Sequence, residues 1–139
     1  MTAGIEKFLR AISYPERVDC DGAGVALLVD GMSIWCEEKS GRIILSWDLE
    51  ASGMQLGQLA RYAAGRILRE EAVLAYGRIG GRTGCFLWQD APVEADSSEL
   101  LRLFESFMNS CDWWRERIKG RPAGEEEPGI AEKTMVIRP

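Results

Sequence analysis

Apolar residues recur along the chain at spacings that predict three amphipathic helices. The first pattern runs from Thr2 to Ser13, and Tyr14-Pro15 ends it because the residue before a proline avoids helical geometry. A second helical pattern runs from Ser52 to Leu68. The third follows Asp96, which with Glu99 forms a capping-box pattern. Its apolar positions are Leu100, Leu101, Phe104, Phe107, Met108, Cys111, Trp114 and Ile118.

Short β-rich runs separated by turn residues lie between these helices. The expected strands are Gly24–Val29, Met32–Glu37, Arg42–Trp47, Ala72–Ile79 and Arg82–Trp88. Asp30-Gly31, Lys39-Ser40-Gly41 and Gly80-Gly81 are the expected turns between successive strands. A loop containing Pro92 is expected from Asp90 to Asp96.

The order of these elements is α-β-β-β-α-β-β-α. Strands joined by tight hairpins, with helices between them, predict an α+β fold with a twisted antiparallel sheet. We expect residues 1–119 to form a single domain. Residues 120–139 break all periodicity and include Glu125-Glu126-Glu127, so we expect a flexible tail. This tail ends in Met135-Val136-Ile137, and the pattern assigns no role to that run.

Large apolar residues are expected on both faces of the small sheet. Trp35 alternates with Ile34 and Cys36 and therefore falls on the opposite face, and Ile44 points away from Trp47 in the same manner. Apolar residues on both faces imply that each face is covered. The cover is either supplied within the monomer or a dimer, or the second face is a groove for an extended partner.

Composition excludes several functional classes. The net charge of −5 (17 basic and 22 acidic residues) argues against nucleic acid as the main partner. Histidine is absent, so neither a Ser-His nor a Cys-His nucleophile can be built. No run approaches the roughly 20 apolar residues of a membrane span, and no N-terminal signal pattern is present. We expect a cytoplasmic protein that binds neither nucleic acid nor membrane.

Candidate chemical motifs also favour structural roles. The four cysteines (Cys20, Cys36, Cys85 and Cys111) form no CxxC pair and are expected to be reduced, mostly buried thiols. The glycines from Gly77 to Gly84 lead from strand to strand rather than into a helix, so they indicate a hairpin instead of a phosphate loop. Around Asp19-Cys20-Asp21-Gly22 the ligand spacing of a calcium loop fails, which favours a turn. We expect no catalytic residue, cofactor or metal site.

The sequence resembles the class I chaperones of bacterial type III secretion, the Tir-chaperone-like (CesT-like) family. The resemblance covers residues 3–118. It is carried by the order of elements, the acidity, the segment Ile43-Ile44-Leu45-Ser46-Trp47, and the last helix, which begins Leu100-Leu101-Arg102-Leu103-Phe104 and ends in Trp114. It implies an acidic cytoplasmic homodimer that binds the N-terminal segment of a secreted virulence effector and keeps that segment soluble and secretion-competent. The export ATPase would be a further partner.

The resemblance also implies where the partners bind, by position and pattern. The effector-binding residues would be Ile5, Phe8, Leu9, Ile12, Leu28, Trp35 and Ile44. The dimer interface would use Leu56, Leu59, Ala63, Leu74 and Tyr76. An added effector strand at a sheet edge would supplement these apolar contacts.

Two other functions are open at this point. The same fold could serve as a regulatory adaptor that sequesters a transcriptional activator or a secretion component. An enzyme using one cysteine would need an accessible thiol of depressed pKa.

Overall fold

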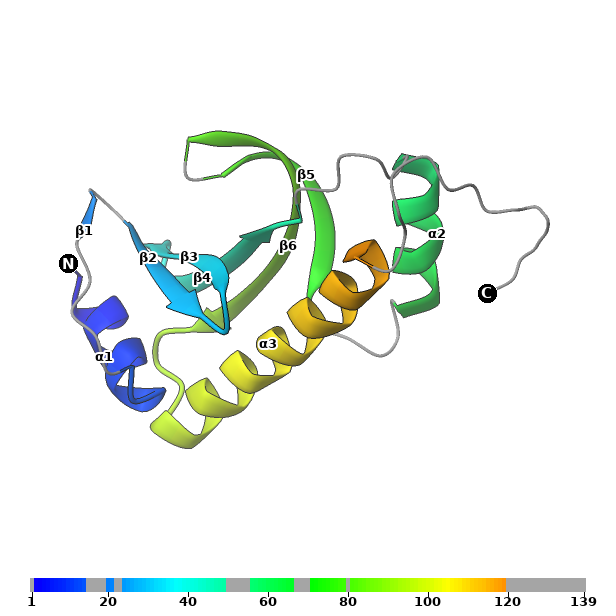
Figure 1. Cartoon of the computed structure of the whole chain (residues 1–139). Helices are drawn as coiled ribbons and strands as arrows, with labels where there is room; N and C mark the ends of the chain where they lie inside the picture. Colours follow the sequence, from blue (N-terminus) through cyan, green and yellow to red (C-terminus); the bar gives the residue numbers. More distant parts are fainter. Residues whose placement is uncertain are drawn as a thin grey trace.

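Three helices and an antiparallel sheet form the described part of the protein (Figure 1). This computed structural model describes residues 2–14, 20–21, 24–49, 56–66, 71–79 and 81–119. The elements are α1 (Ala3–Ala11), β1 (Cys20–Asp21), β2 (Gly24–Val29), β3 (Met32–Lys39), β4 (Arg42–Asp48), α2 (Leu56–Arg66), β5 (Val73–Ile79), β6 (Arg82–Pro92) and α3 (Ser97–Lys119). The strand order is β1-β2-β3-β4-β6-β5, with every neighbouring pair antiparallel.

The predicted α+β class and its order of helices and strands are confirmed, with one addition. The two-residue strand β1 pairs with Gly24 and Val25, where the sequence predicted only a turn. Predicted regions that fall outside the described residues are the tail 120–139, the two ends of the second helix, 52–55 and 67–68, and Asp19, Gly22 and Gly80 of the predicted turns.

Two hairpin turns explain why β2, β3 and β4 follow one another so closely. Asp30 and Gly31 have φ values of 51° and 79°, and Ser40 and Gly41 have 54° and 76°. Paired positive φ angles match the right-handed twist of the flanking strands, and glycine adopts the second of them without steric cost. These two predicted turns are therefore confirmed.

The predicted loop from Asp90 to Asp96 is wrong in its first half. β6 continues to Pro92, with Ala91 opposite Ile43 and Pro92 opposite Arg42. Proline at the last position of a strand removes no ladder hydrogen bond that the sheet needs, so Pro92 does not end the strand early. The N–H of Glu99 donates to Asp96 Oδ1 at 2.9 Å, so Asp96 caps α3.

The core lies between one face of the sheet and the two helices α1 and α3. Sheet residues Ile34, Leu45 and Leu87 are buried there together with Phe107 and Trp114 of α3. The buried face of α3 follows positions 100, 103, 107, 111 and 114. Leu103 is therefore buried, whereas Leu101, which the sequence predicted as part of the apolar stripe, is 36% exposed. α1 is held at its N-terminus by Thr2, whose hydroxyl accepts from the Ile5 N–H.

Aromatic contacts fasten α2 to the C-terminal half of α3. The ring of Tyr62 meets Trp113 edge-on at 6.2 Å and Trp114 at 6.3 Å. The guanidinium groups of Arg66 and Arg117 lie 4.1 and 4.5 Å from the centroid of the Trp113 ring. Cation–π contacts of this kind stabilise a partly exposed tryptophan. Trp113 thus joins the two helices.

Candidate binding surface

The strand register places a second set of apolar side chains on the sheet face that is turned away from α1 and α3. Trp35 pairs with Ser46, and Ser46 pairs with Trp88, so a serine lies between two tryptophans across three strands. Leu28, opposite Ser33, belongs to the same face. We call this surface the open face and define it by Leu28, Trp35, Ile44, Phe86 and Trp88. The predicted apolar residues on both sides of the sheet are therefore observed.

Trp35 is held in a defined orientation on the open face. Its indole Nε1 donates to Glu37 Oε1 at 2.8 Å, and its ring covers Gly24 of the neighbouring strand so closely that a methyl group there would overlap it. An aromatic side chain fixed before a partner arrives loses little conformational entropy on binding. Trp35 is suited to contact an apolar side chain of a partner.

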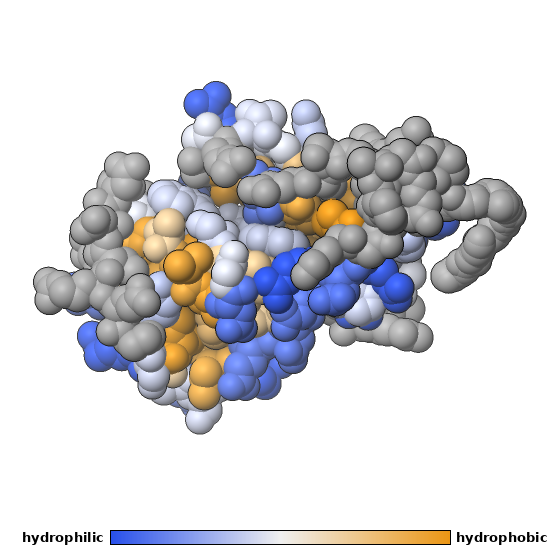
Figure 2. Space-filling model, viewed as in Figure 1, coloured by the Kyte–Doolittle hydropathy of each residue, from blue (hydrophilic) through white to orange (hydrophobic). Residues whose placement is uncertain are grey.

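The predicted effector-binding residues fall into two groups on different sides of the sheet. Leu28, Trp35 and Ile44 lie together on the open face, where Leu28 is 63% exposed. The predicted α1 residues lie with the core on the other side: Ile5 and Phe8 are fully buried, and Leu9 and Ile12 are partly buried at its margin. In the free chain Ile5 and Phe8 therefore present no surface to a partner. Figure 2 shows apolar side chains reaching the surface over β2 and near the meeting point of α1 and α3.

The predicted dimer residues also differ in exposure. Tyr76 on the edge strand β5 is 72% exposed, whereas Leu59 is buried, and Ala63 and Leu74 are partly buried against the core. Of Leu56 only the backbone is described. Exposed Val73, on the same edge strand, was not predicted. Its signal in the sequence was weak, because a single valine at a strand start is also typical of a core position.

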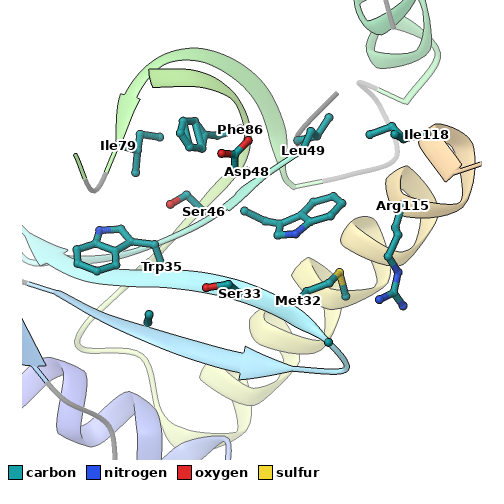
Figure 3. A pocket seen from close by; sticks show the side chains of 13 residues that line it. Met32, Ser33, Trp35, Ser46, Asp48, Leu49, Ile79, Phe86, Arg115 and Ile118 are labelled. Carbon is teal, nitrogen blue, oxygen red and sulfur yellow. The ribbon is translucent and has the colours of Figure 1, made fainter. Parts of the chain in front are cut away.

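A cavity of about 630 Å³ opens at the end of β4, between the open face and the last turns of α3 (Figure 3). Trp35, Ser46, Asp48 and Phe86 line it from the sheet, and Arg115 and Ile118 line it from α3. Sequence reasoning gave no signal for Ser46 or Arg115. Their part in the cavity depends on strand register and on the path of α3.

The outer edge of β2 is partly occupied by a side chain. The Tyr14 hydroxyl accepts from the N–H of Leu28 at 2.9 Å and lies 3.4 Å from its carbonyl oxygen. Among the described residues, β1 pairs only with Gly24 and Val25. A side-chain hydroxyl therefore meets the backbone groups of Leu28 to which an added strand would bond.

The described thiols have the properties of structural cysteines. Cys36 and Cys111 are buried thiols and Cys85 is a half-buried thiol, and the side chain of Cys20 lies outside the described residues. Burial, with a smaller contribution from the charge of Glu37, raises the pKa of Cys36 to about 12. Burial also raises the pKa of Cys85, helped by the charge of Asp48. Both shifts oppose formation of the reactive thiolate.

Neither a metal site nor a membrane span is found within the described ranges. No three acidic or thiol side chains there converge to hold a metal ion. None of the helices in that part of the chain is long and apolar enough to cross a membrane.

Comparisons with known proteins find likeness in structure but not in sequence. No protein-family model and no curated protein sequence matches the chain. A chain of the ExsC–ExsE complex superposes with a TM-score of 0.61 at 13% identity, covering 85% of this chain and 97% of that one. A chain of the HopA1–SchA chaperone–effector complex gives 0.60 at 16% identity, covering 78% and 88%. The structure of the Yersinia pestis type III secretion chaperone SycH with a fragment of YscM2 gives 0.54 at 14% identity, covering 81% and 97%. The chain shares its fold with chains of these complexes.

Proposed function

We propose that this protein is a type III secretion chaperone that binds the N-terminal segment of a secreted effector and keeps it soluble and secretion-competent. The observation that carries the proposal is the open face, where exposed Leu28 lies on the same surface as the fixed Trp35. The shared fold supports it, because two of the similar structures are described as chaperone complexes. The function requires no catalysis, and a net charge of −5 favours a client segment with basic residues.

The client segment would bind in extended form. Alternate side chains of an extended chain point the same way, so apolar residues at every second position can contact the open face together. Leu28, Trp35 and Ile44 form the primary contact in this proposal. Leu9 and Ile12, at the margin of α1, form a second contact for a segment that continues around the β2 edge.

We further propose a cytoplasmic homodimer formed through the exposed surfaces of α2 and β5. Tyr76 contributes the largest exposed apolar surface there, and Gly57 and Ala60 on α2 are exposed small residues that allow close approach of another chain. Leu59, Ala63 and Leu74 lie beneath this surface and support it. Leu56 is the remaining residue of the dimer interface that the resemblance implies. A dimer would present two open faces to one client.

Affinity capture of the tagged full chain from its native cytoplasm tests this function. We expect one co-purified protein, bound through its N-terminal region, in a complex of two chains to one client by light scattering. Leu28→Asp should weaken client binding by at least about tenfold, since it removes a leucine contact and introduces a charge. Leu101→Asp is the matched control, because Leu101 is an exposed leucine on α3. Equal loss in both variants, or a transcriptional activator as the captured partner, would contradict the proposal and favour the adaptor.

Tyr14→Phe tests strand addition at the β2 edge. The substitution removes the hydroxyl from the Leu28 backbone and leaves the ring, so an incoming strand no longer competes with it. One hydrogen bond contributes about 0.5–1.5 kcal/mol net, and we therefore expect client affinity to rise about two- to tenfold by calorimetry. Tyr62→Phe, which removes a hydroxyl on the side of α2 that packs against α3, should leave affinity unchanged. Weaker binding after Tyr14→Phe would mean that the client does not pair with this edge.

A further inference from the structure

The cavity at the end of β4 contains a polar group that its described surroundings leave without a hydrogen bond. Ser46 is only 2% exposed, and its Oγ has no partner among the described residues. In Figure 3 this oxygen points into the space between Trp35 and Phe86. A buried hydroxyl without a partner is costly, so an occupant that offers a backbone or hydroxyl group would be favoured.

The C-terminal end of α3 forms part of the wall of this cavity. Arg115 and Ile118 line it, and α3 ends one residue later at Lys119. Twenty residues follow, and they include the β-branched and apolar run Thr134-Met135-Val136-Ile137. The intervening residues 120–133 can span up to about 45 Å when extended, which is more than the length of any strand in the sheet. The run can therefore reach the cavity of its own chain.

We propose that Thr134–Ile137 docks in this cavity of the same chain. The apolar side chains would contact Trp35 and Phe86, and the Thr134 hydroxyl or a backbone group would bond to Ser46. Two basic residues flank the run, Lys133 and Arg138, and two carboxylates lie on this side of the sheet, Asp48 in the cavity wall and Glu37 beside Trp35. Arg115 also lines the cavity, but its guanidinium is paired with Asp112 at 3.0 Å, so the two carboxylates favour the run over the acidic Glu125–Glu127 segment.

The docked segment would act as an internal competitor for the open face. Only three apolar side chains contribute, and the linker must be ordered, so the contact is weak and persists because tethering raises the local concentration to about the millimolar range. A client with more apolar contacts displaces it. This consequence rests on the proposed chaperone function, whereas the docking itself does not.

Indole N–H resonances of the full chain, recorded by NMR on protein with ¹⁵N-labelled tryptophan, test the docking without any client. Trp35→Phe assigns the Trp35 signal. We expect Val136→Asp to shift that signal relative to wild type, because a charged residue cannot enter the cavity. Ala131→Asp adds the same charge to the same tail outside the run and should leave the signal in place. Both positions lie outside the described residues.

Three results would overturn the proposal. The Trp35 signal could be identical in all forms, it could shift equally in both tail variants, or the Val136→Asp shift could vanish on tenfold dilution. The last result would mean that the run binds a second copy of the chain. Client affinity gives a separate readout: Val136→Asp should bind a client several-fold more tightly. A Trp35 shift without any identifiable client would sustain the docking and count against the chaperone function alone.

Discussion

Replacing Phe8 by alanine is expected to lower the free energy of unfolding of the free protein by about 3–5 kcal/mol. Phe8 is fully buried, and its ring meets that of Phe104 on α3 edge-on, with centroids 5.8 Å apart. The substitution removes this contact and leaves a cavity between α1 and α3 that the helices cannot close. Denaturant unfolding at fixed protein concentration measures the loss, and fixed concentration matters because dimerisation would add to apparent stability.

Leu101→Ala is the control for this experiment, since Leu101 on α3 is 36% exposed and should cost less than about 1 kcal/mol. The comparison separates two roles for the first helix. The resemblance implied that Phe8 contacts an effector, whereas the structure buries it within the chain. An unchanged unfolding midpoint for Phe8→Ala, together with weaker client binding, would mean that α1 leaves the core and presents Phe8 to the client.

Local sequence signals predicted the elements well because their causes are local. The turns at Asp30-Gly31 and Ser40-Gly41 need residues that accept positive φ, and the sequence supplies them at those positions. Alternation placed Trp35 and Ile44 on the face opposite Ile34 and Cys36, because successive side chains of a strand point to opposite sides. The error at Pro92 arose from reading proline as a loop residue without the position of the neighbouring strand β4.

The binding surface was harder to predict because it depends on contacts between distant segments. An amphipathic α1 has one apolar face, and only the position of α3 decides whether that face is core or surface. Leu28 and Ile44 could be paired with Trp35 because hairpin register links them. The cavity joins Ser46 to Arg115, which are far apart in sequence, and no periodicity relates them.

The shared fold leaves the partner undetermined, because one fold can host unrelated functions and sequence identity to the similar structures is low. The described cysteines bear on one alternative, an enzyme that uses a cysteine nucleophile. A nucleophilic cysteine needs a lowered pKa and access to solvent, whereas Cys36 has a pKa raised to about 12 by burial and by the charge of Glu37.

The raised pKa of Cys36 also makes the stability of the folded protein depend on pH. The folded-state pKa of Cys36 lies above its ordinary value of 9.0. Its contribution to stability is therefore fully present below about pH 9, and it is lost as the pH rises towards 12, because the unfolded chain releases the proton first.

Alkylation of the native protein at pH 8 is expected to modify Cys36 about a thousandfold more slowly than an unfolded control, since the thiolate fraction falls by about three powers of ten when the pKa rises from 9 to 12. Mass spectrometry of the modified peptides measures each site. Half-buried Cys85 serves as the internal comparison and should react faster than Cys36. Rapid, selective labelling of Cys36 in the folded protein would contradict its burial and would favour a cysteine enzyme over a binding protein.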